Sequence, residues 1–338
     1  MCGIYGIAKS PTPYTNQQLK TAKKVLREMA IDSESRGAHS SGIAKVGANT
    51  RIYKSLLPSS KFVDSSNYHE AVKSLATDSY ILLGHTRFAT EGAIVKANAH
   101  PFRVGDVVGA HNGCVYNISE MQSKLDKQCP VDSQLIFKSI NDNDNIEDAV
   151  KNFDADFALS FVKKNPMKLY LCRENNRPLY VAYVPAMKTL FYASEDSFIE
   201  DAMVKAGITD VDVYSLNKNT LYAFDTTMFD DIKTNVVKTS FKYDSRVYHY
   251  NMNNYASRYS LADDGEWEPI IPQSYIDDEK LSLSQMYGGE PDEWFYDDVQ
   301  DEWCYADSES GQIMTEEQVA ELWYKEEFAY DDEMEAVL

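Results

Sequence analysis

The chain of 338 residues lacks two features that direct proteins into or across membranes. No apolar run approaches the ~18 residues that a membrane-crossing helix needs. The N-terminus also lacks the basic, then apolar, then small-residue pattern of a secretory signal. These absences favour a cytoplasmic protein without a membrane segment.

Cysteine and histidine are too few and too scattered for a disulfide framework or a zinc site. The cysteines are odd in number and irregularly spaced, and none forms a metal-ligand pattern with a histidine. No glycine-rich loop of the phosphate-binding type follows a strand-like run. We therefore expect no metal and no cofactor. The residues concerned are Cys2, Cys114, Cys129, Cys172, Cys304, His39, His69, His85, His100, His111 and His249.

Positive charge is scarce in the last part of the chain. Residues 1–240 carry 28 Lys and Arg against 27 Asp and Glu, a net charge of +1, whereas residues 241–338 carry 5 against 26, a net charge of −21. All four tryptophans lie in that last part: Trp267, Trp294, Trp303 and Trp323. We predict a domain over 1–240 and an acidic, Trp/Tyr-rich extension over 241–338. The extension is either disordered and partner-binding or a compact domain, and its charge argues against direct nucleic-acid binding.

Residues 1–240 alternate between strand-like and helix-like patterns, which predicts an α+β fold. Thr15 is placed to cap the first helix. Strands are predicted at 3–8, 42–46, 80–85, 107–111, 157–162, 169–172, 179–184, 189–193, 211–215 and 220–224, and helices at 17–31, 68–76, 118–125, 133–140, 146–152 and 197–206.

Cys2 directly follows the initiator methionine and is the most informative residue of the chain. Once Met1 is removed, Cys2 carries a thiol and a free α-amine on one residue. An α-amine has a pKa of about 8, so it can act as a base near neutral pH. Cys2 is therefore a candidate nucleophile with its own proton acceptor. The alternative is a small buried cysteine that opens a strand.

Three downstream positions supply what an amide-cleaving cysteine needs. Arg87 follows an apolar strand, and an arginine can grip a carboxylate with two parallel hydrogen bonds. Asp132, at the start of a predicted helix, suits an ammonium group. Asn112 and Gly113 offer a side-chain amide and a backbone N–H, the two donors of an oxyanion hole. Together they describe a pocket for a free amino acid whose side chain ends in a carbonyl, and glutamine fits.

Five motifs occur in an order that resembles a known family. They begin at Cys2 (Cys-Gly-Ile-x-Gly), Arg36 (Arg-Gly-x-x-Ser-Ser-Gly), His85 (His-Thr-Arg-x-Ala-Thr), Asn98 (Asn-Ala-His-Pro) and His111 (His-Asn-Gly). This order resembles the glutaminase domain of class II glutamine amidotransferases, which are N-terminal-nucleophile hydrolases, and is most similar to the glucosamine-6-phosphate synthase branch. The resemblance covers about the first 225 to 240 residues and implies a four-layer αββα sandwich.

The resemblance also implies a role for each site residue. Cys2 is the nucleophile, its α-amine is the general base, and the Asn112 side chain and Gly113 N–H form the oxyanion hole. The glutamine α-carboxylate is expected on Arg87 and Thr90, and its α-ammonium on Asp132 and the Gly113 carbonyl. His100 shapes the substrate loop, and Phe88 gates the passage of ammonia.

Three functional interpretations stay open. The first is an enzyme that hydrolyses L-glutamine to glutamate and ammonia through a Cys2 thioester. The second is an N-terminal-nucleophile hydrolase of another amide, and the third is a catalytically vestigial interaction protein that acts through its acidic tail. Residues 241–338 are too short for an acceptor domain, so either a separate acceptor or synthase protein uses the ammonia or the chain is a free-standing glutaminase. A homo-oligomer is compatible with the sequence, and a retained Met1 would remove the proposed base.

Overall fold

The computed structural model describes residues 2–89, 93–125, 129, 131–143, 145–150, 152–163, 167–174, 176–209 and 211–243, and beyond them five short strands. The chain divides into two compact units, Met1–His249 and Tyr250–Leu338. Within the described part of the chain, no helix has the length and apolar character needed to cross a membrane.

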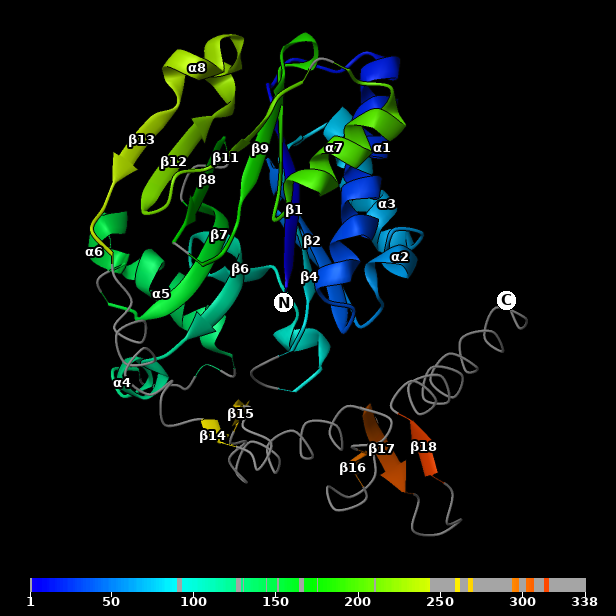
Figure 1. Cartoon of the computed structure of the whole chain (residues 1–338). Coiled ribbons are helices and arrows are strands. Elements are labelled where there is room, and N and C mark those ends of the chain that lie inside the picture. The colour runs from blue at the N-terminus through cyan, green and yellow to red at the C-terminus, as the bar shows by residue number, and fades with distance from the viewer. Residues whose placement is uncertain are drawn as a thin grey trace. The chain divides into compact units, whose positions relative to one another are not determined.

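A seven-stranded antiparallel sheet carries the N-terminus at its centre (Figure 1). Its order is β11 (Val213–Ser215), β9 (Tyr180–Val184), β10 (Thr189–Ala193), β1 (Gly3–Lys9), β4 (Ser79–Arg87), β2 (Ser40–Gly47) and β3 (Arg51–Ser55). Four helices accompany it: α1 (Asn16–Asp32), α2 (Ser59–Phe62), α3 (Ser66–Lys73) and α7 (Asp196–Ala206). The predicted cap of α1 is confirmed, because the Thr15 hydroxyl accepts the Gln18 N–H and the Gln18 side chain accepts the Thr15 N–H.

A six-stranded antiparallel sheet forms the second half of this unit. Its order is β13 (Val237–Ser240), β12 (Thr220–Asp225), β8 (Lys168–Arg173), β7 (Ala155–Lys163), β6 (Val107–Val115) and β5 (Phe102–Val104). The helices α4 (Ile118–Gln122), α5 (Asp132–Asp142) and α6 (Ile146–Val150) lie along its outer face, and α8 (Ile232–Asn235) joins β12 to β13 (Figure 1).

Three apolar clusters hold these layers together. One joins α1, α3 and α7 to the seven-stranded sheet, and a second joins α5 and α6 to the six-stranded sheet. The third lies between the two sheets and contains Ile4 and Leu83 from one and Val108 and Leu171 from the other. Each buried Leu or Ile stabilises such a layer by about 1.5–3 kcal/mol. The predicted α+β fold, with two antiparallel sheets and helices, is confirmed.

The end of the first unit lies slightly beyond the predicted boundary at residue 240. Phe241 is buried, and its ring stacks on Phe157 at 6.5 Å. The Tyr243 hydroxyl donates to the Ala155 carbonyl at 2.7 Å and accepts the Ala155 N–H at 2.6 Å. These contacts extend the packed region to residue 243.

In the second unit, the structure describes β14 (Tyr259–Leu261) paired with β15 (Trp267–Pro269), and a sheet of β16 (Trp294–Asp297), β17 (Glu302–Ala306) and β18 (Ile313–Thr315). In the pair β16–β17, Trp294 lies opposite Tyr305, and Tyr296 lies opposite Trp303. Trp267, Trp294 and Trp303 therefore lie in short antiparallel strand pairs.

Candidate active site

The Cys2 thiol lies at the head of the central strand β1 and meets the backbone at the end of β4. Its Sγ accepts the Phe88 N–H at 3.2 Å and lies 3.3 Å from the Phe88 carbonyl, to which the thiol donates. Register explains this contact, since Gly3 pairs with Thr86 and Cys2 therefore reaches the residues that follow β4. Burial raises the pKa of the Cys2 thiol, whereas the Phe88 N–H and the Arg87 charge act in the opposite direction.

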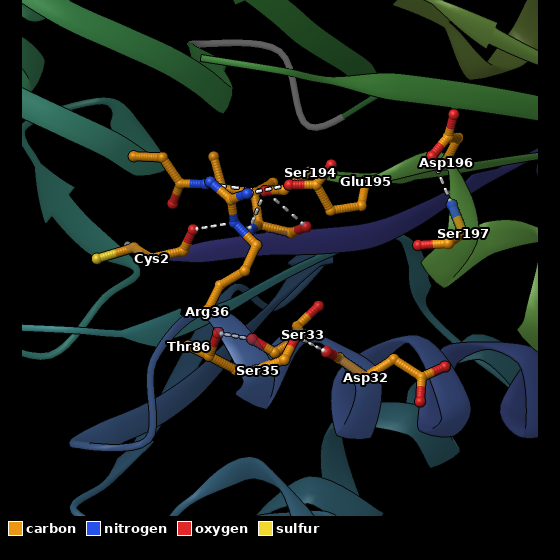
Figure 2. Close-up of polar contacts among 12 residues, drawn as sticks. Cys2, Asp32, Ser33, Ser35, Arg36, Thr86, Ser194, Glu195, Asp196 and Ser197 are labelled. Atoms are coloured by element: carbon orange, nitrogen blue, oxygen red, sulfur yellow. Dashed lines mark hydrogen bonds and ion pairs between the residues drawn. The ribbon is translucent and has the colours of Figure 1, made fainter. Parts of the chain in front are cut away.

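The main chain of Cys2 is held by Arg36, the last residue of the short helix η1 (Ser33–Arg36). Arg36 Nε donates to the Cys2 carbonyl at 2.7 Å, and its Nη1 forms an ion pair with Glu195. Figure 2 shows the guanidinium between these two partners. The Arg36 side chain is buried, so its contacts with the Cys2 carbonyl and with Glu195 restrict the movement of the Cys2 backbone.

Ser194 connects the strand of the nucleophile with the candidate oxyanion residue. Its hydroxyl oxygen accepts the Ile4 N–H at 2.8 Å and the Asn112 side-chain amide at 2.8 Å. The Ser194 N–H in turn donates to the Ile4 carbonyl at 2.9 Å. The residue pair Ser194–Glu195, directly after β10, therefore ties down Cys2 through Arg36 and Asn112 through a hydroxyl.

Asn112 and Gly113 lie in β6, opposite Ala158 and Phe157 of β7. One N–H of the Asn112 amide is committed to Ser194, and the amide has a second N–H for a substrate. Gly113 has φ of 140°, and a Cβ at this position would lie 1.9 Å from the Asp156 carbonyl oxygen. Only glycine fits this backbone, because it tolerates the positive φ and has no Cβ to meet the Asp156 carbonyl.

Arg87 ends β4 and is almost completely buried, with 4% of its surface exposed. Its Nη1 donates to the Ala93 carbonyl at 3.2 Å, and the Asn98 amide donates to the same carbonyl at 2.9 Å. Burial lowers the pKa of Arg87, while the negative charges of Cys2 and Asp132 raise it. Arg87 is thus within electrostatic reach of both the thiol and Asp132. Thr90, its expected helper, lies outside the described residues.

Asp132 is the first residue of α5, and its carboxylate is already oriented by the backbone. Oδ2 accepts the Val115 N–H at 3.0 Å, and Oδ1 accepts the Ser133 N–H at 2.7 Å. The carboxylate thereby links Val115, two residues after Gly113 at the end of β6, to the start of α5. Two oxygens carry about four acceptor positions, so it can still receive a cation.

Three buried histidines, His85, His100 and His111, lie close together in the first unit. The rings of His85 and His100 lie 4.1 Å apart, and His85 Nε2 is 3.1 Å from the His111 carbonyl. His111 bonds through its two ring nitrogens to the Ser133 hydroxyl at 2.9 Å and the Asp156 carbonyl at 3.1 Å. Burial lowers the pKa of all three, that of His85 to about 3. His100, expected to shape the substrate loop, is therefore a neutral packing residue in a buried stack that also includes Phe102.

Phe88, the expected gate, is the most exposed residue of the site, at 45% of its surface. Its ring stacks on His39 with centroids 4.7 Å apart. Among the residues that the structure describes, no group of three or more His, Cys, Asp or Glu side chains could hold a metal ion. The chemistry available at this site is that of a thiol, a guanidinium, a carboxylate and amide donors.

The structure thus brings together Cys2, Arg87, Phe88, Asn112, Gly113 and Asp132, which were predicted from separate motifs. It adds three positioning groups to which the sequence assigned no role: Arg36, Ser194 and Glu195. Arg36 occurs in the second of the five motifs, and Ser194-Glu195 directly follows β10, the strand that pairs with β1. No pattern in the sequence pairs these segments, because Arg36 and Glu195 are 159 residues apart.

Comparison with known proteins shows which proteins this chain is similar to. Residues 85–201 match the family described as "Glutamine amidotransferase domain". The glutamine–fructose-6-phosphate aminotransferase of Gluconobacter oxydans is 27% identical over 196 residues, which are 54% of this chain and 30% of that protein. The amidophosphoribosyltransferase of Methanocaldococcus jannaschii is 32% identical over 131 residues, 37% of this chain and 25% of that protein.

Solved structures show the same fold. Glutamine phosphoribosylpyrophosphate amidotransferase from B. subtilis, complexed with ADP and GMP, aligns with a TM-score of 0.52 and 15% identity over 86% of this chain and 59% of that one. A structure titled the allosteric regulatory enzyme of purine biosynthesis aligns with a TM-score of 0.54 and 16% identity, at the same coverage of both chains.

Residues 85–201 thus match a glutamine amidotransferase domain, and the chain is similar to class II glutamine amidotransferases, with glutamine–fructose-6-phosphate aminotransferases among the relatives that it matches. The matched region spans about a third of the length of such curated relatives, at 30% of the Gluconobacter protein.

Proposed function

We propose that this chain hydrolyses the side-chain amide of L-glutamine to glutamate and ammonia, with Cys2 as the nucleophile. The observation that carries the proposal is the setting of the Cys2 thiol. Its Sγ is held by both backbone groups of Phe88, next to the buried Arg87, while Ser194 joins β1 to the Asn112 amide. These two sets of hydrogen bonds support the assignment of Cys2 as nucleophile, with Arg87 adjacent in sequence to Phe88, and of Asn112 as oxyanion donor.

Recognition of the substrate begins with the two charged groups on its α-carbon. The Arg87 guanidinium suits the α-carboxylate, and the Asp132 carboxylate suits the α-ammonium. Both side chains are at least nine-tenths buried, so their charges are poorly screened by water. This pair selects a free amino acid over an amide within a peptide chain, and it disfavours the reading as a general amide hydrolase.

The first chemical step is attack of the Cys2 sulfur on the glutamine carboxamide carbon. The α-amine of Cys2, free once Met1 is removed, takes the thiol proton, and the carbonyl oxygen becomes an oxyanion. The second N–H of the Asn112 amide and the Gly113 N–H stabilise that oxyanion. Return of the proton from the α-ammonium to the leaving nitrogen releases ammonia and leaves a γ-glutamyl thioester on Cys2.

The second step consumes one water. The α-amine accepts a proton from that water, whose oxygen attacks the thioester carbonyl in the same oxyanion site. The C–S bond breaks, glutamate leaves and the thiol is regenerated. Neither step needs a cofactor, and we assign to the exposed Phe88 ring the role of limiting access of water or escape of ammonia.

The ammonia that this reaction releases can be transferred to different acceptors. Glutamine is named in both the Gluconobacter relative and the B. subtilis structure, whereas their acceptors differ, fructose 6-phosphate in one and phosphoribosylpyrophosphate in the other. Because the match covers 30% of the Gluconobacter protein, it supports the glutamine-cleaving half of the reaction. We propose that a separate acceptor protein receives the ammonia, with free glutaminase activity in its absence.

The test is release of glutamate and ammonia from L-glutamine by the full chain. Glutamine whose α-amine is acetylated and glutamine whose α-carboxylate is amidated serve as controls, since each removes one charge that Asp132 or Arg87 reads. We expect turnover of L-glutamine and little turnover of either blocked form. Equal turnover of the blocked amides would establish a general amide hydrolase instead, and the absence of any turnover in Met1-processed protein would contradict the proposal.

A further inference from the structure

His39 contacts each of three consecutive residues at the end of β4. It lies between η1 and β2, and its backbone N–H donates to the Arg87 carbonyl at 3.0 Å. Its Nδ1 accepts the Ala89 N–H at 2.9 Å. Between these two contacts, its ring stacks on Phe88 with centroids 4.7 Å apart and planes inclined by 28°.

The acceptor role of Nδ1 defines the state of the ring. A nitrogen that accepts an N–H carries no proton, so His39 is neutral with its proton on Nε2. Burial first, and then the positive charge of Arg87, lower the pKa of His39 to about 4. The ring therefore keeps its acceptor at every pH at which a glutamine-cleaving enzyme is expected to work.

The segment that His39 holds is the one that organises the candidate site. Arg87 supplies the guanidinium, and Phe88 supplies both backbone groups that meet Cys2 Sγ. The chain approaches this segment closely at Gly37, where a Cβ would lie 2.4 Å from the Phe88 nitrogen. A side chain that shifts residues 87–89 would therefore displace the guanidinium and the thiol's partners together.

We propose that His39 is a positioning residue for glutamine binding, which acts by holding residues 87–89 through its Nδ1 acceptor and its stacked ring. The inference rests on the proposed glutaminase function of the same site. His39 does not touch the reacting atoms, and its effect passes through Arg87 and Phe88. Loss of the acceptor affects binding of the substrate α-carboxylate more than the chemical step, because Asn112 and Gly113 are held by other contacts.

Three variants of the full chain separate the two contacts of the ring. H39N retains an acceptor oxygen near the position of Nδ1 and loses the ring, whereas H39F retains the ring and loses the acceptor. H39A loses both. His69, on the exposed side of α3, offers a matched control in H69A. All four are checked for an unchanged thermal unfolding midpoint before their kinetics are compared.

Two measurements follow. We expect H39F and H39A to raise KM for glutamine about tenfold, the factor that loss of one hydrogen bond produces. In both, kcat falls by a smaller factor than KM rises, because the Phe88 N–H that meets the Cys2 sulfur is displaced together with Arg87, and H39N and H69A remain near the wild type. Independently of glutamine, the pH profile for alkylation of Cys2 by iodoacetamide, followed by peptide mass, shifts to higher pH in H39F, since the Phe88 N–H stabilises the thiolate.

The pH profile of Cys2 alkylation tests the role of His39 separately from the proposed glutaminase function. If the wild type turns over no glutamine, the proposed function fails, and the Cys2 profile of H39F against H39N still decides the role of His39. Kinetics and profiles like those of the wild type in both H39F and H39A would overturn the positioning role. Impairment of a folded H39N equal to that of H39F would show that the Nδ1 acceptor is not what holds the segment.

Discussion

Asn112 and Ser194 join the two sheets at the candidate site through a hydrogen bond of 2.8 Å. Asn112 belongs to β6 of the six-stranded sheet, and Ser194 directly follows β10 of the seven-stranded sheet. The same hydroxyl accepts the Ile4 N–H, two residues after the nucleophile. One serine therefore connects β1, the strand that follows the proposed nucleophile Cys2, with the proposed oxyanion donor Asn112 on the other sheet.

Replacement of Ser194 by alanine tests this relationship. Ser194→Ala leaves the Ile4 N–H and the Asn112 amide without their buried acceptor, which costs about 1–3 kcal/mol of the free energy of unfolding. Because Asn112 is no longer held, we expect kcat to fall by about tenfold or more with KM little changed. Urea unfolding and steady-state glutamate release measure the two effects.

Ser79→Ala is the matched control for that variant. Ser79 is also buried on the seven-stranded sheet, and its hydroxyl has no hydrogen-bond partner among the described residues. We expect this variant to keep both stability and activity. If Ser194→Ala behaved like Ser79→Ala, Ser194 would not be what positions the oxyanion donor.

Asn112→Ala removes the proposed side-chain donor of the oxyanion hole. The oxyanion exists only in the transition state, so kcat is expected to fall about 10²–10³-fold while KM changes little. Steady-state kinetics with L-glutamine give both constants. An effect on KM alone would make Asn112 a substrate-binding residue instead.

Arg87→Lys keeps the charge but loses the forked contact. Lysine cannot form two parallel hydrogen bonds with a carboxylate or replace the bond to the Ala93 carbonyl, so KM for glutamine is expected to rise with kcat largely kept. Arg51→Lys is the control, because Arg51 is exposed on β3 and forms an exposed ion pair with Glu70. An unaltered KM in Arg87→Lys would place the α-carboxylate elsewhere.

The buried histidines predict sensitivity to acid. Histidine has an ordinary pKa of about 6.5, whereas burial lowers the pKa of His85 to about 3 and that of His100 well below its usual value. Below about pH 6.5 the unfolded chain binds protons that the folded chain does not. The free energy of unfolding should therefore fall with pH from 6.5 downward, by up to about 1.4 kcal/mol per pH unit for each such histidine.

Urea unfolding at several pH values between 7 and 5 measures that slope. Both ring nitrogens of His100 are buried and have no hydrogen-bond partner among the residues that the structure describes, so His100→Phe removes a titrating group without removing a described hydrogen bond. We expect a shallower slope in His100→Phe and an unchanged slope in His69→Phe, on the exposed side of α3. Equal slopes in all three proteins would contradict the assignment of a buried neutral His100.

Truncation tests the proposed division of the chain. We propose that the acidic extension serves recognition or regulation and not the chemistry, since every assigned catalytic residue precedes residue 133. A fragment that ends at His249 should keep glutaminase activity, while one that ends at Ser240 should be less stable, because it loses Phe241 and Tyr243 from the packing around Phe157. Loss of activity in a folded fragment 1–249 would show that the extension is needed for the chemistry.

Much of the fold could be predicted from the sequence, because burial on two sheets leaves a strong pattern. The prediction located β1, β4, β7, β8 and β10 to within two residues at either end. It missed β3, β5 and β13, which lie at sheet edges and are three to five residues long. Their polar side chains weaken the alternation of apolar and polar residues that marks a strand. It ended β6 at His111, whereas the ladder with β7 continues through the Asn-Gly pair to Val115.

The site was predictable only where one residue type implies one chemistry. Cys2, Arg87, Asn112 and Asp132 were named because each carries a group that amide cleavage needs. Arg36, Ser194 and Glu195 act through other residues, so nothing in their local sequence distinguishes them from an ordinary ion pair or a strand-end serine. His39 is similar, since its role depends on a contact with Ala89, 50 residues away.

The central claim is that Cys2, with a free α-amine, forms a thioester with glutamine. Rapid acid quenching of the full chain during turnover, followed by intact-mass and peptide-mass measurement, tests it directly. We predict a chain without Met1 that carries one γ-glutamyl group on the Cys2 peptide, and no such adduct in Cys2→Ala. An active protein that retains Met1, or an adduct on any other residue, would contradict the account.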